Sequence, residues 1–173
     1  MISTNSCQLP EGALLSIYNR KGVYTDCYKT DISGAVTHAL YVQAFYTTFV
    51  FKLERLILRW AVSKPSSDAQ AARLAEGAID TFAAWHVENR SENQLLMCDF
   101  QGRTRSWLMV EPLEGENGLQ TRLYFGSAVL AMKNAKIGNV SLGVEFRALL
   151  GFHKIYSRIL LYSTKSRLSK RKT

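Results

Sequence analysis

Cysteine is scarce in this sequence, and its arrangement excludes a disulfide-stabilised fold. Cys7, Cys27 and Cys98 are odd in number and have no paired spacing, whereas small domains held by disulfides carry even numbers of cysteines at recurring intervals. Neither these cysteines nor the three histidines have the spacing of zinc ligands. We therefore expect reduced, mostly buried thiols, no metal site and no cofactor.

Long apolar segments are also missing. Charged residues interrupt every apolar run before it reaches the roughly 20 residues needed to cross a bilayer. The segment Met1–Pro10 has neither the basic start nor the apolar centre of a secretion signal, so we expect a cytoplasmic protein. No internal repeat or low-complexity linker divides the 173 residues, which predicts a single domain with a core over about residues 11–163.

Acidic residues are absent from the end of the chain. Residues 1–145 contain 14 basic and 14 acidic side chains, whereas residues 146–173 contain 8 basic and no acidic ones, so this end carries the whole net charge of +8. We predict that residues 164–173 form a frayed, solubilising basic tail. The alternative is a weak contact between this tail and an anionic membrane or nucleic-acid phosphates.

The most informative stretch is the apolar run Leu142–Leu161. Basic residues follow one another along it and beyond it at spacings of seven, four and seven, at Arg147, Lys154, Arg158 and Lys165. At about 100° per residue these side chains stay within roughly 20° of one line. The spacing predicts one long helix with a basic stripe and an apolar remainder, which needs a large surface to cover.

Apolar periodicity predicts the remaining elements. Val23–Asp31 alternates in the manner of a strand. Val36–Val62 carries a helical apolar stripe with a weak point at Thr47 and Thr48, and a shorter helix over Ala69–Glu76 begins at serine caps and stops at a glycine. Four period-two segments then predict an antiparallel meander: Phe82–Asn89, Gln94–Asp99, Arg103–Glu111 and Leu119–Met132.

This order predicts an α+β fold. A curved antiparallel sheet wraps a long C-terminal helix, and two helices are inserted after the first strand. Several short segments carry a resemblance to known proteins: Asp26-Cys27-Tyr28, Ala44-Phe45-Tyr46, Leu53–Leu56, Arg103–Leu108 and Gly151–Lys154. They resemble a bacterial family of uncharacterised proteins that we associate with the helix-grip fold of the START and polyketide-cyclase (SRPBCC) superfamily.

The resemblance implies a cavity between the sheet and the last helix that accepts a small apolar or amphipathic ligand. It implies no particular reaction, since lipid carriers, chaperone activators and cyclases share the fold. The superfamily has a larger sheet than the one predicted here, so either Ala13–Tyr18 supplies a further strand or the sheet is trimmed. The side chains that we expect to line the cavity are Tyr24, Asp26, Arg105, Trp107, Tyr124, His153 and Tyr156.

Arg105 is the most informative of these residues because of what it requires. It shares one face of its predicted strand with Arg103 and Trp107. If this face is the inner one, Arg105 needs a carboxylate partner, which we expect to be Asp26 or Asp99. A structural ion pair or an exposed strand edge is favoured here over an anion-binding site.

Two alternatives to ligand binding stay open. The first is an enzyme of the cyclase or hydratase type, in which His153 transfers a proton together with Asp26 or Tyr24. The second is a peripheral adaptor that docks on an anionic membrane or nucleic acid through the basic tail. A nucleophilic Cys27 acting with His153 is disfavoured, because nothing in the sequence brings a base near this thiol.

Overall fold

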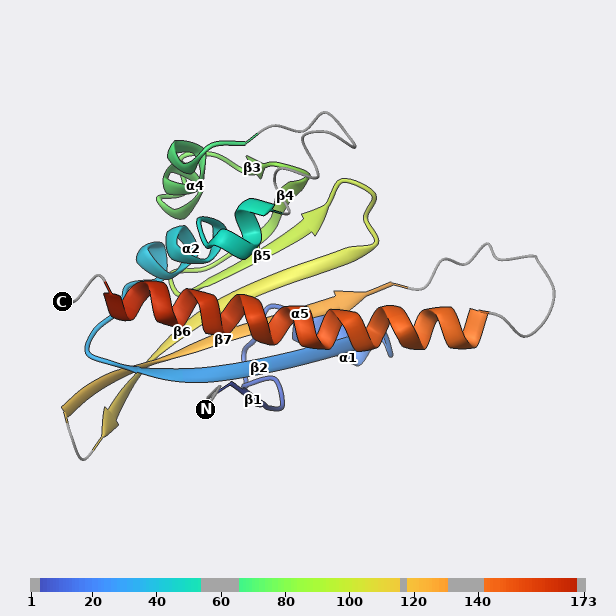
Figure 1. Cartoon of the computed structure of the whole chain (residues 1–173), viewed down its shortest axis with the longest axis horizontal. Helices are drawn as coiled ribbons and strands as arrows, with labels where there is room; N and C mark the ends of the chain where they lie inside the picture. The colour runs from blue at the N-terminus through green and yellow to red at the C-terminus, as the bar shows by residue number, and fades with distance from the viewer. Residues whose placement is uncertain (1–3, 54–65, 116–117, 131–141, 171–173) are drawn as a thin grey trace.

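The computed structural model describes residues 4–53, 66–115, 118–130 and 142–170, and over residues 142–153 it describes the course of the chain and not the side chains. The elements are, in chain order, β1 (Asn5–Ser6), α1 (Ser16–Arg20), β2 (Tyr24–Ser33), α2 (His38–Tyr46), α4 (Asp68–Ala75), β3 (Thr81–Phe82), β4 (Trp85–Arg90), β5 (Gln94–Asp99), β6 (Thr104–Gly115), β7 (Gly118–Val129) and α5 (Leu142–Lys170) (Figure 1).

The strands of the described residues form one open, seven-stranded antiparallel sheet in the order β1-β2-β7-β6-β5-β4-β3. The meander predicted from the period-two segments is confirmed as β4 to β7, each paired with the next. The first predicted strand is confirmed as β2, which pairs with the last strand along its whole length, from Tyr24 opposite Val129 to Ser33 opposite Gln120. The α+β class and the long terminal helix are therefore as predicted.

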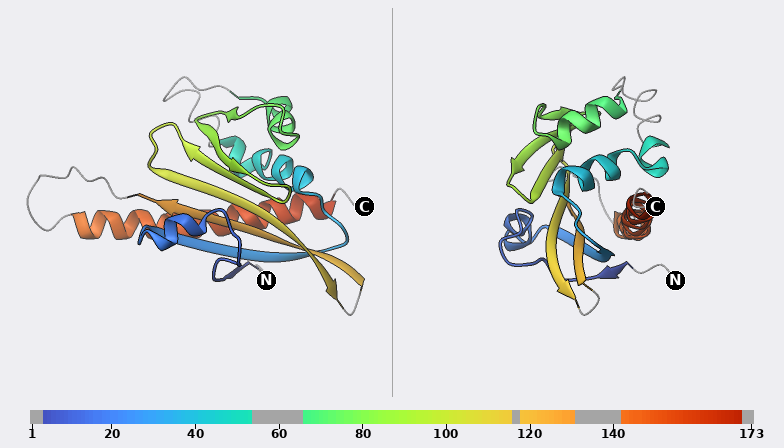
Figure 2. Two further views of the ribbon diagram at one scale, coloured as in Figure 1. Left: turned by 180° about the vertical axis from the view of Figure 1, so that it is seen from behind. Right: turned by 90° about the vertical axis from the view of Figure 1, so that its left-hand side faces the viewer.

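Both faces of the sheet are covered. In the right-hand view of Figure 2, α5 is seen along its axis on one side of the sheet, and α1 lies on the other side. Alternate residues of β7 divide between two hydrophobic cores: Leu123 and Phe125 join the core beneath α2 and α5, whereas Tyr124 and Ala128 join a smaller core beneath the N-terminal segment. The side-chain period of two therefore gives each strand one set of residues for each layer.

The helix predicted over Val36–Val62 divides at its two threonines. The Thr47 hydroxyl donates a hydrogen bond to the Gln43 carbonyl at 2.7 Å, and the Thr48 hydroxyl donates one to the Phe45 carbonyl at 3.0 Å. Hydroxyls that bond locally compete with the helical hydrogen-bond ladder, so α2 ends at Tyr46 and residues 49–53 resume as helix. The predicted weak point is confirmed, and the predicted continuation over residues 54–62 lies outside the described residues.

The shorter predicted helix is confirmed as α4, and its start follows from its capping residues. The Ser67 hydroxyl accepts a hydrogen bond from the Gln70 amide at 3.2 Å, and the Gln70 side chain accepts one from the Ser67 amide at 2.9 Å. This reciprocal capping box satisfies two amides that the first helical turn leaves unpaired. Gly77 follows the helix with a φ of 77°, a conformation that favours glycine.

The suggestion that Ala13–Tyr18 supplies a further strand is wrong. Hydrogen bonds from the Ala13 amide to the Pro10 carbonyl and from the Ser16 amide to the Ala13 carbonyl close successive turns, and they lead into α1. Leu15 and Tyr18 are buried against the second face of the sheet. The backbone groups of this segment form hydrogen bonds within its own turns, and its apolar side chains pack against the sheet. The segment therefore covers the sheet instead of adding a strand to it.

The prediction of a frayed tail from residue 164 is also wrong for the described residues. Helix α5 continues to Lys170, with Thr164 fully buried and Leu168 only 1% exposed in the core beneath the helix. The buried positions 160, 164 and 168 recur every four residues, so the packing face extends past the predicted end of the core. Among the described helices, none combines the length and apolarity that a bilayer span requires.

Candidate ligand-binding pocket

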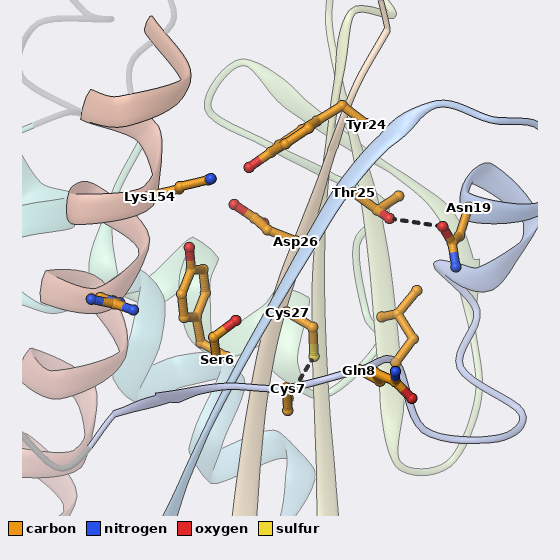
Figure 3. Close-up of a pocket in the computed structure, with 12 residues that line it drawn as sticks. Ser6, Cys7, Gln8, Asn19, Tyr24, Thr25, Asp26, Cys27 and Lys154 are labelled. Carbon is orange, nitrogen blue, oxygen red and sulfur yellow. Dashed lines mark hydrogen bonds between the residues drawn. The ribbon is translucent and has the colours of Figure 1, made fainter. Parts of the chain in front are cut away.

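A pocket of about 660 Å³ lies at the outer edge of β2, between the N-terminal segment and α5. Its walls come from residues 6–9, Asn19, residues 24–28 and two residues of α5 (Figure 3). We call this site the edge pocket. The side chains that matter most for its chemistry are Cys7, Tyr24, Asp26, Tyr28, Lys154 and Arg158.

The edge pocket exists because β1 is much shorter than β2. The register of β1 covers only Tyr28 and Lys29 of β2, and one further hydrogen bond joins the Cys7 amide to the Cys27 carbonyl at 2.9 Å. The chain then leaves the sheet toward α1, where the Thr25 hydroxyl donates to the Asn19 side chain at 3.3 Å. The divergence of the two segments opens the pocket around the beginning of β2.

Two cations of α5 lie over two aromatic rings of β2. The Lys154 ammonium is 6.0 Å from the centre of the Tyr24 ring, and the Arg158 guanidinium is 5.5 Å from the centre of the Tyr28 ring. Both distances fall within the range of cation–π attraction. The basic stripe predicted on the terminal helix therefore faces the sheet at these two positions, although sequence reasoning did not place them in a site.

Asp26 is the acidic side chain among the described pocket residues. Its Oδ1 accepts hydrogen bonds from the Ser127 hydroxyl at 2.5 Å and the Ser127 amide at 3.2 Å. Figure 3 shows the Asp26 carboxylate, the Tyr24 hydroxyl and the Lys154 ammonium pointing toward one another. Ser127 thus fixes one carboxylate oxygen, and the carboxylate stays directed toward the pocket.

The two pocket tyrosines are held in the protonated form. Burial, reinforced by the negative charge of Asp26, raises the pKa of Tyr24 to about 12. The same two causes raise the pKa of Tyr28 to about 12, and the positive charge of Arg158 opposes this shift. Both phenols are therefore hydrogen-bond donors at neutral pH.

The structure does not bring all the expected site residues together. Tyr24 and Asp26 line the edge pocket, and Tyr156 is half-buried against the core beneath α5. The side chain of His153 lies outside the described residues. Arg105, Trp107 and Tyr124 lie on the opposite face of the sheet from α5, as the smaller core shows for the two aromatic residues.

Arg105 forms the expected ion pair, but both expected partners are wrong. Its Nε donates to Glu88 at 2.8 Å and to the Tyr18 hydroxyl at 2.8 Å, and its Nη1 donates to the Gly102 carbonyl at 2.6 Å. The Tyr18 hydroxyl also donates to Glu88. Glu88 lies on β4 and Arg105 on β6, and β5 separates these two strands in the sheet. The residue pattern of a single strand cannot predict which residues of other strands lie close to it.

Trp107 and Tyr124 are structural residues of the smaller core. The Trp107 indole donates to the Gln94 side chain at 2.9 Å, and the Tyr124 hydroxyl donates to Glu111 at 2.8 Å. Their rings lie 6.1 Å apart. Buried aromatic residues whose polar atoms already have protein partners act here as core side chains.

One close pair was not predicted at all. The sulfur atoms of Cys7 and Cys27 lie 3.2 Å apart in the wall of the edge pocket. All three cysteines are free thiols, and Cys98 lies elsewhere, at the end of β5. Within the described residues, no group of three cysteine, histidine or acidic side chains comes together to hold a metal ion.

Comparisons with known proteins assign no family to the chain. No protein-family model matches it. No curated protein matches it at a significant level. The geometry and chemistry of the edge pocket are therefore the basis for the function proposed below.

Proposed function

We propose that this protein binds a small amphipathic ligand with an anionic group in the edge pocket. The observation that carries the proposal is the pair of α5 cations, Lys154 and Arg158, held over the rings of Tyr24 and Tyr28. Within the described part of the chain, neither cation forms an ion pair with an acidic side chain. They are available to an anion that enters beside them.

The pocket offers matching contacts for each part of such a ligand. The described lining of the edge pocket contains two cations, Lys154 and Arg158, and one carboxylate, that of Asp26. Its net charge is therefore positive, which favours an anionic group. The faces of Tyr24 and Tyr28 offer apolar surface, and their hydroxyls donate hydrogen bonds. Asp26 accepts from a hydroxyl or amine elsewhere on the ligand.

Size and polarity support the same class of ligand. A volume of about 660 Å³ lies within the range of roughly 300 to 1,000 Å³ that is common for small-molecule sites. The lining includes several uncharged polar side chains, such as Ser6, Gln8 and Asn19. Burying these groups against a wholly apolar ligand would leave them without hydrogen bonds, which is unfavourable. An amphipathic ligand avoids that cost.

We also propose that the fold is of the helix-grip type. The order of elements supports this: one long strand, inserted helices, a meander and a terminal helix packed on the sheet. β2 pairs with β7, the last strand of the meander, and α5 packs against β2, where the edge pocket lies. A cytoplasmic location, inferred from the sequence, remains part of the proposal.

Two fluorescent probes with the same ring system test the proposal. One is 8-anilino-1-naphthalenesulfonate, which is anionic, and the other is N-phenyl-1-naphthylamine, which is neutral. We expect saturable binding of the sulfonate to one site per chain, with tighter affinity than the neutral probe. Lys154→Met and Arg158→Met each remove a cation and keep an apolar stem, so each should weaken sulfonate binding about five- to tenfold and change neutral binding little.

Lys170→Met is the matched control, because it removes the same charge from the exposed far end of α5. It should leave both affinities unchanged. Equal loss of sulfonate binding in Lys154→Met and Lys170→Met would show that only net charge matters and would refute the proposed site. Circular dichroism of each variant separates loss of the site from loss of the fold.

The peripheral adaptor is a second candidate, favoured by one observation. Ile155, Ile159 and Tyr162 are 61%, 42% and 43% exposed and recur along one side of α5, next to Lys154 and Arg158. Exposed apolar side chains flanked by basic ones suit an anionic lipid surface. Flotation with phosphatidylserine-containing vesicles should then be reduced by Ile159→Ser and unchanged by Ile17→Ser. Ile17 is an exposed isoleucine of α1, the helix on the opposite side of the sheet from α5.

The enzyme hypothesis has no such observation behind it, because the His153 side chain lies outside the described residues. It makes a separate prediction. If His153→Ala leaves probe binding intact and abolishes turnover of a substrate found later, the pocket belongs to an enzyme. Unchanged turnover in this variant would exclude His153 as the proton-transfer group.

A further inference from the structure

Cys7 and Cys27 occupy opposite positions on two antiparallel segments. The register of β1 and β2 pairs Asn5 with Lys29 and Ser6 with Tyr28, so the next pair in sequence is Cys7 with Cys27. The hydrogen bond from the Cys7 amide to the Cys27 carbonyl, at 2.9 Å, continues the ladder to this pair. The two sulfur atoms are 3.2 Å apart, and Figure 3 shows the side chains directed toward each other.

This arrangement is close to the geometry that a disulfide requires. Opposite residues of an antiparallel pair have Cα atoms about 4.5 to 5.5 Å apart, within the roughly 4.4 to 6.8 Å that disulfides span. A disulfide has a sulfur–sulfur distance of about 2.05 Å. Small rotations of the two side chains supply the remaining approach, and the backbone register stays as it is.

The two thiols differ in accessibility and acidity. Cys7 is half-buried and faces the edge pocket, whereas Cys27 is buried. The hydrogen bond with Cys27 lowers the pKa of the Cys7 thiol, burial opposes this shift, and the positive charges of Lys29 and Arg122 add to the lowering. The same hydrogen bond, together with burial, raises the pKa of Cys27. Cys7 is therefore the attacking thiol and Cys27 the resolving one.

We propose that Cys7 and Cys27 form a dithiol modification site that hydrogen peroxide oxidises to an intramolecular disulfide. In the first step the Cys7 thiolate attacks one peroxide oxygen. The oxygen–oxygen bond breaks, and the leaving hydroxide takes a proton to become water. In the second step the Cys27 sulfur, losing its proton, attacks the sulfur of the Cys7 sulfenic acid and displaces a second water. Two thiols are oxidised by two electrons, and one hydrogen peroxide is reduced to two waters.

The site is independent of the ligand proposed for the edge pocket, but oxidation alters the pocket. Both cysteines lie in its wall. A disulfide fastens the segment after β1 to the open edge of β2, and it closes a covalent loop between residues 7 and 27. Closing this loop restricts the unfolded chain, so the oxidised protein should unfold at a higher temperature than the reduced protein.

Cys98 provides an internal control. It is buried at the end of β5, where its thiol donates to the Asp99 carbonyl at 3.3 Å, and burial raises its pKa. In the described structure it has no thiol neighbour like that of Cys7. A buried thiol with a raised pKa reacts slowly, so Cys98 should stay reduced while the other two react.

The test treats the full reduced chain with one equivalent of hydrogen peroxide and measures its mass and thiol content. We expect loss of two hydrogen atoms from the intact mass and a fall from three titratable thiols to one. Tryptic digestion without reductant should give one linked species that joins residues 1–20 to residues 22–29. Cys98→Ser should behave in the same way, with its thiol count falling from two to none.

Single variants distinguish the two roles. Cys27→Ser should stop at the Cys7 sulfenic acid, trapped by dimedone, whereas Cys7→Ser should react at least tenfold more slowly. Three thiols remaining after treatment would overturn the proposal. So would a linkage that contains Cys98, or a disulfide between two chains, which a non-reducing gel and size-exclusion chromatography reveal. If the oxidised protein no longer binds the sulfonate probe, the disulfide also controls ligand binding in the edge pocket. If probe binding is unchanged, the disulfide forms without controlling ligand binding.

Discussion

The guanidinium of Arg158 lies over the ring of Tyr28, 5.5 Å from its centre. Tyr28 is itself buried in the core beneath α5, so this contact joins the surface of the helix to the main packing layer. Lys154 makes a similar contact with Tyr24 one helical turn earlier. These two contacts between α5 and β2 thus lie at the edge pocket, and a ligand there would act directly on this part of the interface between helix and sheet.

The end of α5 contributes to stability, although its composition is basic. Leu168 is 1% exposed within the main core, so Leu168→Ala should lower the free energy of unfolding by about 2 to 5 kcal/mol. Ile159→Ala, on the exposed side of the same helix, should cost less than about 1 kcal/mol. Urea midpoints of the two variants check this. Equal midpoints would mean that the last turns of α5 do not pack as described.

The fold was largely predictable because its longer strands and helices carry their own periodic signals. The alternation in β2 and the meander marks strands, and the spacing of Arg147, Lys154 and Arg158 marks a long helix. Thr47 and Thr48, two β-branched residues in a row, marked the weak point at which α2 ends. These signals all depend on residues within a few positions of one another, and for that reason one sequence was enough.

The site was less predictable because its contacts join distant segments. Cys7 meets Cys27 through the register of a two-residue strand, which is too short to leave a periodic signal. The pairing of Arg105 with Glu88 required knowledge of the strand order. Strand alternation did show that Arg105 and Trp107 share a face, but alternation alone does not say which face meets the terminal helix.

Gly126 marks a close approach on the second face of the sheet. A Cβ atom there would lie 2.8 Å from the Leu15 side chain, 2.9 Å from the Trp107 ring and 3.0 Å from the Asp26 carbonyl. Gly126→Ala should therefore destabilise the protein by about 1 to 3 kcal/mol through overpacking. The check is a double-mutant cycle by chemical denaturation. Leu15→Ala makes room, so the double variant should be more stable than additivity of the two single changes predicts, and strict additivity would place Leu15 away from Gly126.

The ion pair between Arg105 and Glu88 should couple the N-terminal segment to the sheet. The Arg105 side chain is mostly buried and also bonds the Tyr18 hydroxyl. Arg105→Met leaves Glu88 unmatched, and we expect a loss of about 1 to 3 kcal/mol, moderated because Glu88 keeps contact with water. Glu88→Gln should cost less once Arg105 is already Met. Thermal and urea unfolding of the four proteins measure the coupling, and a coupling near zero would show that the pair is not formed in solution.

His38 should make the protein sensitive to mild acid. It is the first residue of α2, and burial, together with the positive charge of Arg90, lowers its pKa from 6.5 to about 4, while a hydrogen bond with the Leu108 backbone opposes this. The unfolded chain therefore binds a proton on His38 at a higher pH than the folded chain does. Stability should fall as pH drops from about 6.5 to 4, by about 2 to 3 kcal/mol in total.

The pH range in which protonation of His38 destabilises the protein can be separated from the range in which protonation of Asp31 does so. The hydrogen bonds from Arg122 hold the pKa of Asp31 below its ordinary value of 3.8, so the stability that Asp31 contributes is lost only at lower pH, below the window of His38. His38→Gln cannot titrate and should flatten the free energy of unfolding between pH 6.5 and 4, as measured by urea denaturation at each pH. His86→Gln, which changes an exposed histidine of β4, should keep the wild-type slope. A slope that survives in His38→Gln would assign the acid sensitivity to another group.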